Sequence, residues 1–80
     1  MKSIWIANFK DNEIKVENTW FHGERLYING KLQDEKFSIF SSNLTGKIQN
    51  EMIKVNLGGF FKVKCSVFVN DTKIKIKQIK

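Results

Sequence analysis

Hydrophobic and polar residues alternate along most of this chain. In residues 3–9, 13–18 and 52–57, apolar side chains recur with a spacing of two, which is the period of a β-strand with one buried face. No stretch places apolar residues at helical spacing. Asn, Gly and Asp interrupt the alternating segments, and these residues favour turns. The pattern therefore predicts seven or eight short antiparallel strands and no helix.

The strongest local signal is Asn29-Gly30, which lies between two strand-like runs. Both central residues of a type I′ turn have positive φ, so this pair predicts a two-residue hairpin. Pairing outward from the turn would then join Ile28 to Lys31, Tyr27 to Leu32, Leu26 to Gln33 and Arg25 to Asp34. The buried face of this hairpin would contain Trp20, Leu26, Ile28, Phe37 and Ile39. We expect a bulge or bend near Gly23.

The second half of the chain predicts further hairpins. One would turn at Asn50-Glu51, and Asn70-Asp71 would connect the longest strand, residues 60–69, to a last strand at residues 72–79. On one side of this final hairpin the expected pairs are Val67–Ile74 and Cys65–Ile76. On the other side they are Phe68–Lys73, Ser66–Lys75 and Lys64–Lys77.

The chain also contains a weak internal repeat. Residues 14–16 match residues 53–55, and residues 26–30 match residues 67–71 in pattern, at spacings of 39 and 41 residues. An ancient duplication would produce this repeat. Two similar hairpins required by one sandwich would also produce it, and the sequence alone favours this second interpretation.

These elements predict an all-β fold in one domain, residues 1–80. We expect a small antiparallel β-sandwich of immunoglobulin-like architecture, with a small closed β-barrel as the alternative. The single cysteine, Cys65, cannot form an internal disulfide, which favours a reducing compartment. No secretory pattern is visible, and no apolar run approaches the ~20 residues of a membrane-spanning helix. We therefore expect a cytoplasmic protein without a membrane partner.

The net charge of +6 is unevenly distributed. Residues 1–51 contain seven basic and seven acidic residues, whereas residues 52–80 contain seven lysines and one aspartate. The preference for Lys, Ile and Asn over Arg, Ala and Pro matches an A/T-rich genome, so the charge alone is weak evidence for a partner. The basic C-terminal part indicates either a solvated sheet edge that resists aggregation or a site for an anionic partner.

Motifs for catalysis or metal binding are absent from the sequence. His22 is the only histidine and has no nucleophile motif near it, and Cys65 lies in an alternating apolar face where a small core residue is expected. One histidine and one cysteine cannot form a zinc site of four Cys or His ligands. We therefore expect a protein that is not an enzyme and that holds no metal or cofactor.

Two groups of residues are candidate contact surfaces. The pairing expected at Asn70-Asp71 would gather lysines and aromatics on one outer face, which could follow a phosphate backbone while bases stack on the rings. This possible polyanion-binding face consists of Phe60, Lys62, Lys64, Phe68, Lys73, Lys75 and Lys77. A possible aromatic contact patch consists of Trp20, His22 and Tyr27.

Two classes of function follow from these surfaces. The first is a small non-catalytic β domain that binds a protein partner or itself through an exposed sheet face or edge. The alternative is a β-barrel that binds single-stranded nucleic acid through the C-terminal lysine and phenylalanine face. The sequence favours the first class.

Overall fold

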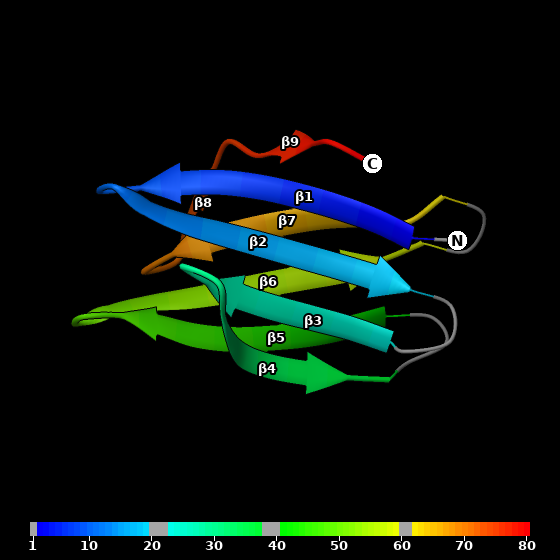
Figure 1. The fold of residues 1–80 in the computed structure, drawn as a ribbon, viewed down its shortest axis with the longest axis horizontal. Coiled ribbons are helices and arrows are strands. Elements are labelled where there is room, and N and C mark those ends of the chain that lie inside the picture. The colour runs from blue at the N-terminus through cyan, green and yellow to red at the C-terminus, as the bar shows by residue number, and fades with distance from the viewer. Residues whose placement is uncertain (1, 20–22, 38–40, 60–61) are drawn as a thin grey trace.

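A computed structural model describes residues 2–19, 23–37, 41–59 and 62–80 of the chain, which form nine strands and no helix in two antiparallel sheets (Figure 1). The first sheet has the order β4-β3-β2-β1-β9 and the second the order β5-β6-β7-β8. The first sheet contains β1 (Lys2–Phe9), β2 (Asn12–Thr19), β3 (Gly23–Ile28), β4 (Lys31–Lys36) and β9 (Lys77–Gln78). The second contains β5 (Ser41–Ile48), β6 (Glu51–Gly58), β7 (Lys64–Val69) and β8 (Thr72–Ile74).

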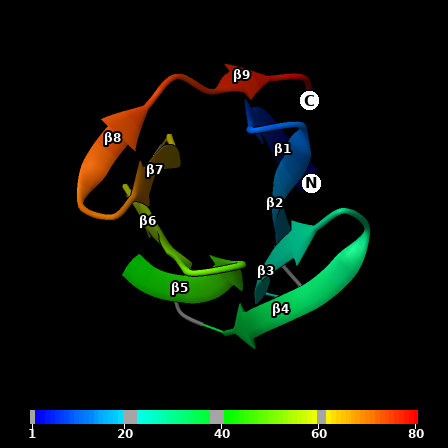
Figure 2. The same ribbon diagram turned by 90° about the vertical axis from the view of Figure 1, so that its left-hand side faces the viewer.

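The sheets face each other across a hydrophobic core, as a view along the strands shows (Figure 2). Inward side chains come from alternate positions of both sheets, which is the arrangement that the period-two pattern predicts. The most deeply buried are Ile14, Val16, Leu26, Leu44, Ile53, Val55 and Val67. The all-β fold of two antiparallel sheets is thus confirmed, and the strands do not close into a continuous barrel.

The hairpin at Asn29-Gly30 is confirmed at its turn, where the two residues have φ values of 52° and 81°. The first two pairs beyond the turn also follow the predicted register. The register then shifts, so that Leu26 pairs with Asp34 and Arg25 with Glu35. The predicted Arg25–Asp34 pair is therefore wrong, and Arg25 Nε instead donates to Glu35 Oε2 at 3.1 Å.

This shift is a bulge at Gln33, where the sequence predicts none. The bulge or bend expected near Gly23 borders residues 20–22, which lie outside the described residues. A bulge inserts one unpaired residue and bends its strand. Asp34, next to it, reaches the other sheet, where its Oδ2 accepts a hydrogen bond from the Thr45 N–H at 3.0 Å. Glycine is required at position 23 because its φ is 78° and because a Cβ there would lie 2.3 Å from the carbonyl oxygen of Lys36.

Several predicted boundaries are wrong. Phe37 lies after the end of β4 and is 68% exposed, so it is not a core residue. The second hairpin turns at Gln49-Asn50, one residue earlier than predicted, because Ile48 pairs with Glu51. The strand expected at residues 60–69 is only the six-residue β7. Trp20, Ile39 and Phe60 lie outside the described residues.

The C-terminal segment changes sheets. Val67 pairs with Ile74 and Phe68 with Lys73, as predicted, but β8 then ends and the chain crosses to β1 (Figure 2). There, Ile6 pairs with Lys77, and the Ile79 N–H donates to the carbonyl oxygen of Ile4 at 2.9 Å.

The predicted pairs Cys65–Ile76, Ser66–Lys75 and Lys64–Lys77 are therefore wrong. The sequence pattern continues as a strand, but the unpaired backbone groups of β1 provide a second edge that the segment can satisfy.

Two equivalent turns relate the halves of the molecule. Asn29 exchanges backbone and side-chain bonds with Glu13: its N–H donates to the Glu13 carbonyl oxygen, and its Oδ1 accepts the Glu13 N–H, both at 2.9 Å. Asn70 makes the same two bonds with Met52, also at 2.9 Å. Each half is a four-stranded meander, β1–β4 and β5–β8. The two halves therefore share their strand order and their turn bonds, in addition to the sequence repeat.

Replacing either turn asparagine tests this equivalence. Asn29→Ala and Asn70→Ala each leave the backbone N–H of Glu13 or Met52 without its acceptor. Each also places alanine at a position with positive φ, so each should lower the free energy of unfolding by ~1–3 kcal/mol. Urea unfolding measures the change. Asn50→Ala is the matched control, since Asn50 is an exposed turn residue without a side-chain hydrogen bond or positive φ. Equal effects at all three positions would contradict the assigned role of the two turns.

Candidate functional site

The outer face of the first sheet is balanced in charge. Glu17 lies 3.6 Å from Lys2 Nζ and 3.4 Å from Lys15 Nζ, and Arg25 pairs with Glu35. Tyr27 belongs to the same network, since Lys15 Nζ lies 4.8 Å from the centre of its ring. Tyr27 and Glu35 raise the pKa of the Arg25 guanidinium above its ordinary value. Most of the charges on this face are therefore paired within it, and Glu13 and Lys77 are the described exceptions.

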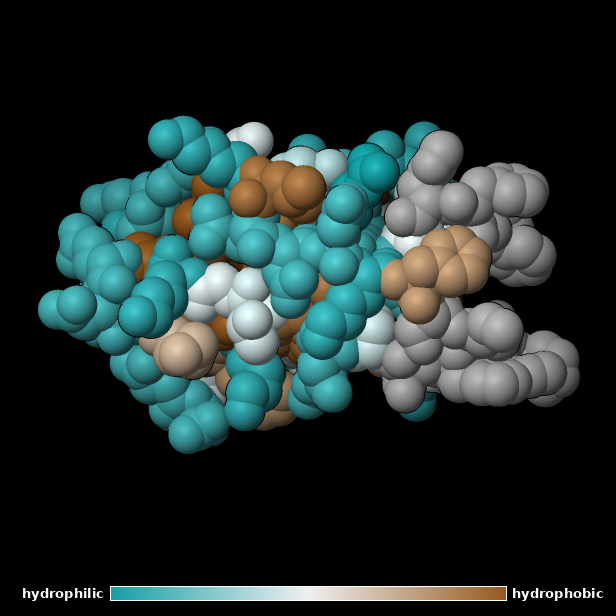
Figure 3. Space-filling view, turned by 90° about the horizontal axis from the view of Figure 1, so that it is seen from below, coloured by the Kyte–Doolittle hydropathy of each residue, from teal (hydrophilic) through white to brown (hydrophobic). Residues whose placement is uncertain are grey.

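Of the predicted aromatic contact patch, only Tyr27 can be placed. It is half-buried on the outer face of β3, under Lys15. Trp20 and His22 lie outside the described residues. Among the described residues, the large exposed apolar side chains are Leu32, Phe37, Met52 and Ile79. From the side of β4 and β5 the surface is mainly hydrophilic, with small separate apolar areas (Figure 3).

The outer face of the second sheet has a different charge pattern. Its outward positions alternate with the buried ones and carry four exposed lysines, which we call the lysine face: Lys47, Lys54, Lys64 and Lys73. No outward position of β5–β8 carries an acidic side chain. Lys54 alone among the four has an ion pair, with Asp71 of the neighbouring turn at 3.9 Å. Positive charge thus remains unbalanced on this face.

Cross-strand register places an aromatic ring in the middle of the lysine face. Phe68 of β7 pairs with Lys54 on one side and with Lys73 on the other. Neighbouring strands lie about 4.8 Å apart, so the two lysines stand roughly 10 Å from each other across the ring. The half-buried Phe68 is therefore flanked on the two neighbouring strands by lysine residues.

The structure brings together only part of the polyanion-binding face expected from the sequence. Lys64, Phe68 and Lys73 share the outer face of the second sheet. Lys75 and Lys77 leave with the crossing segment, and Lys77 pairs with Ile6 in the first sheet. Lys62 is exposed just before β7, and Phe60 lies outside the described residues.

The sequence analysis missed two members of the lysine face, Lys47 and Lys54. Alternation in residues 52–57 did indicate that Lys54 points away from the core. Only the pairing of β6 with β7 places Lys54 beside Phe68, because strand order is not encoded in the alternation.

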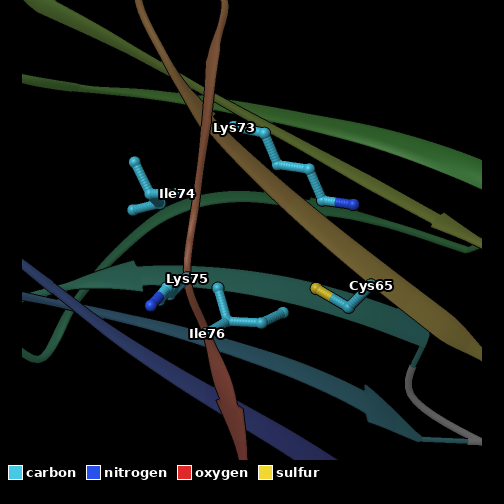
Figure 4. A pocket seen from close by; sticks show the side chains of 5 residues that line it. All are labelled: Cys65, Lys73, Ile74, Lys75 and Ile76. Atoms are coloured by element: carbon cyan, nitrogen blue, oxygen red, sulfur yellow. The ribbon is translucent and has the colours of Figure 1, made fainter.

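A groove opens beside β7 where β8 ends. It has a volume of about 500 Å³ and is lined by Cys65, Lys73, Ile74, Lys75 and Ile76 (Figure 4). Burial raises the pKa of the Cys65 thiol to about 12, so the side chain is a neutral thiol at physiological pH. A neutral thiol is a weak nucleophile, and the groove offers no activated group for covalent chemistry.

Two further polar side chains are buried, Glu24 and Ser42. Glu24 Oε2 and Ser42 Oγ are buried without a hydrogen-bond partner. Within the described ranges, no group of three or more His, Cys, Asp or Glu side chains could hold a metal ion. Nor does any helix in these ranges have the length and apolar character needed to cross a membrane.

The chain matches no protein-family model, and no curated protein or solved structure is significantly similar to it.

The Cys65 thiol predicts a specific loss of stability at alkaline pH. Its folded pKa of about 12 exceeds the ordinary value of 9.0, so the stabilisation is complete below pH 9.0 and is lost as the pH rises toward 12. Urea unfolding of the wild type and of Cys65→Ala across this range should show a steeper decline for the wild type. Lysine titration affects both proteins alike, and parallel declines would contradict the prediction.

Proposed function

We propose that this chain is a non-catalytic binding module that holds a negatively charged partner protein on its lysine face. The observation that carries the proposal is the contrast between the two sheets. The first sheet pairs most of its outer charges, whereas the second presents four lysines of which only Lys54 has an acidic partner. In this proposal the two packed antiparallel sheets form a sandwich of immunoglobulin-like architecture, and this sandwich supports the binding face.

Electrostatics supports an acidic partner more than a second copy of this chain. A symmetric contact between two lysine faces would place like charges opposite each other, which is destabilising. An acidic surface would instead be attracted over about a Debye length, ~8 Å at physiological ionic strength, and would associate faster. The lysine face therefore favours binding of a different protein over self-association.

Single-stranded nucleic acid is the second candidate, and the position of Phe68 favours it. A base can stack on an aromatic ring while the flanking phosphates contact lysines, and such stacking contributes about 1–3 kcal/mol per base. Lys54 and Lys73 flank Phe68 in this manner. Phe68 is only half-buried, which leaves part of its ring for contact.

Charge reversal tests the lysine face. The triple variant Lys54→Glu, Lys64→Glu and Lys73→Glu should weaken binding of polyglutamate, measured by fluorescence anisotropy, at least about tenfold. The matched control reverses Lys31, Lys36 and Lys80, which have no ion pairs and give the same net charge. Equal losses in both variants would show that net charge, and not this face, determines binding.

Phe68 distinguishes the two candidates. Phe68→Ala should weaken binding of an oligothymidylate about tenfold if bases stack on the ring, and should leave polyglutamate binding nearly unchanged. Thermal unfolding of the variant checks that the fold is retained. If oligothymidylate binds no more tightly than polyglutamate, and Phe68→Ala does not change its affinity, single-stranded nucleic acid is ruled out as the partner.

A further inference from the structure

The outer edge of β7 loses its partner strand halfway along. Val69 pairs with Thr72 and Val67 with Ile74, where β8 ends. In a hairpin with a two-residue turn, the pair next to the turn and every second pair after it form two backbone hydrogen bonds with each other. In β7, Val69 and Val67 therefore direct their N–H and C=O groups toward β8. Cys65 is the next residue in this series, so its N–H and C=O point to the side that β8 has left.

The alternation on the opposite side of β7 agrees with this assignment. Ser66 pairs with Asn56 and Phe68 with Lys54, and the equivalent bond from the Asn70 N–H to the Met52 carbonyl oxygen is 2.9 Å long. Even-numbered residues of β7 therefore bond to β6. No described residue pairs with Cys65 on the other side, and unpaired backbone groups at a sheet edge are a template for another strand.

The groove beside this edge has two chemically different sides. Cys65, Ile74 and Ile76 are partly buried and pack against the core, which makes the inner side apolar. Lys73 and Lys75 line the same groove and are exposed (Figure 4). Lys64 adds a third exposed ammonium group, next in sequence to Cys65.

We propose that this edge of β7 binds a short extended segment of the partner protein as an added strand, in which acidic and apolar residues alternate. Successive side chains of a strand point to opposite faces. One set of the segment's side chains would lie on the inner face with Cys65 and Ile76. The other set would lie on the outer face near Lys64 and Lys73, where carboxylates complement the lysines. This inference rests on the proposed function and specifies the partner's binding segment.

Within the described ranges, no segment is left unpaired that could fill this edge. Residues 77–80 are already bonded to β1. A second copy is also a poor occupant, because its alternating segment, residues 72–77, carries Lys73, Lys75 and Lys77 and would oppose like charges. Charge complementarity therefore selects an acidic segment from a different protein.

A synthetic peptide of alternating glutamate and valine is the probe. It should bind more tightly than a peptide of the same composition with glutamates and valines in separate blocks, by about tenfold in fluorescence anisotropy. N-methylation of every valine amide and of every glutamate amide gives two further peptides. Because only alternate amides of an added strand face β7, one methylated peptide should lose binding about tenfold and the other should retain it.

Amide hydrogen exchange reports the site without any substitution in the protein. The alternating peptide should slow exchange at the Cys65 N–H and leave the Ser66 N–H, which already bonds to β6, unchanged. Slower exchange at Cys65 together with unequal effects of the two methylations supports strand addition. Equal effects of both methylations, or unchanged exchange at Cys65, would overturn it.

The outcomes separate this inference from the function on which it rests. If the block peptide and both methylated peptides bind like the alternating one, and the triple lysine variant binds none of them, the acidic-partner proposal stands and strand addition is wrong. If neither polyglutamate nor any of the peptides binds, both proposals are wrong.

Discussion

The need to satisfy backbone groups at strand edges determines the architecture of this protein. Two four-stranded meanders leave edge strands whose N–H and C=O groups face outward, and a small core cannot compensate for many unpaired groups. The C-terminal segment divides between two such edges: residues 72–74 bond to β7, and residues 77–80 bond to β1. This crossing joins the second sheet to the first.

The other side of the sandwich has a related connection. The bulge at Gln33 bends β4, and Asp34 accepts the Thr45 N–H of β5. Thr45 and Ile6 occupy equivalent positions in the two halves, 39 residues apart. Asp34, after β3, thus bonds to β5, the first strand of the second half. Lys77, after β7, bonds to β1, the first strand of the first half. This correspondence adds to the similarity of the two halves that the asparagine turns show.

The same crossing produces the surfaces that we propose to be functional. Because residues 75–80 turn toward β1, Cys65 loses a backbone partner and a groove opens beside it. The lysines that the sequence predicts on one face are divided between the two sheets and the crossing segment. Lys64 and Lys73 stay on the second sheet, where Lys47 and Lys54 share their face. The charge asymmetry between the two parts of the sequence becomes a difference between two outer faces, one with mostly paired charges and one with mostly unpaired lysines.

The sequence by itself determined most of the strands and turns and most of the division into buried and exposed positions. These follow from local rules, such as the period of two and the preference of Asn29-Gly30 for positive φ. Tertiary structure alone decided the bulge at Gln33, the end of β8 at Ile74 and the neighbours of Phe68. Each of these depends on which distant backbone groups compete for the same hydrogen bonds, and alternation along one strand carries no information about that competition.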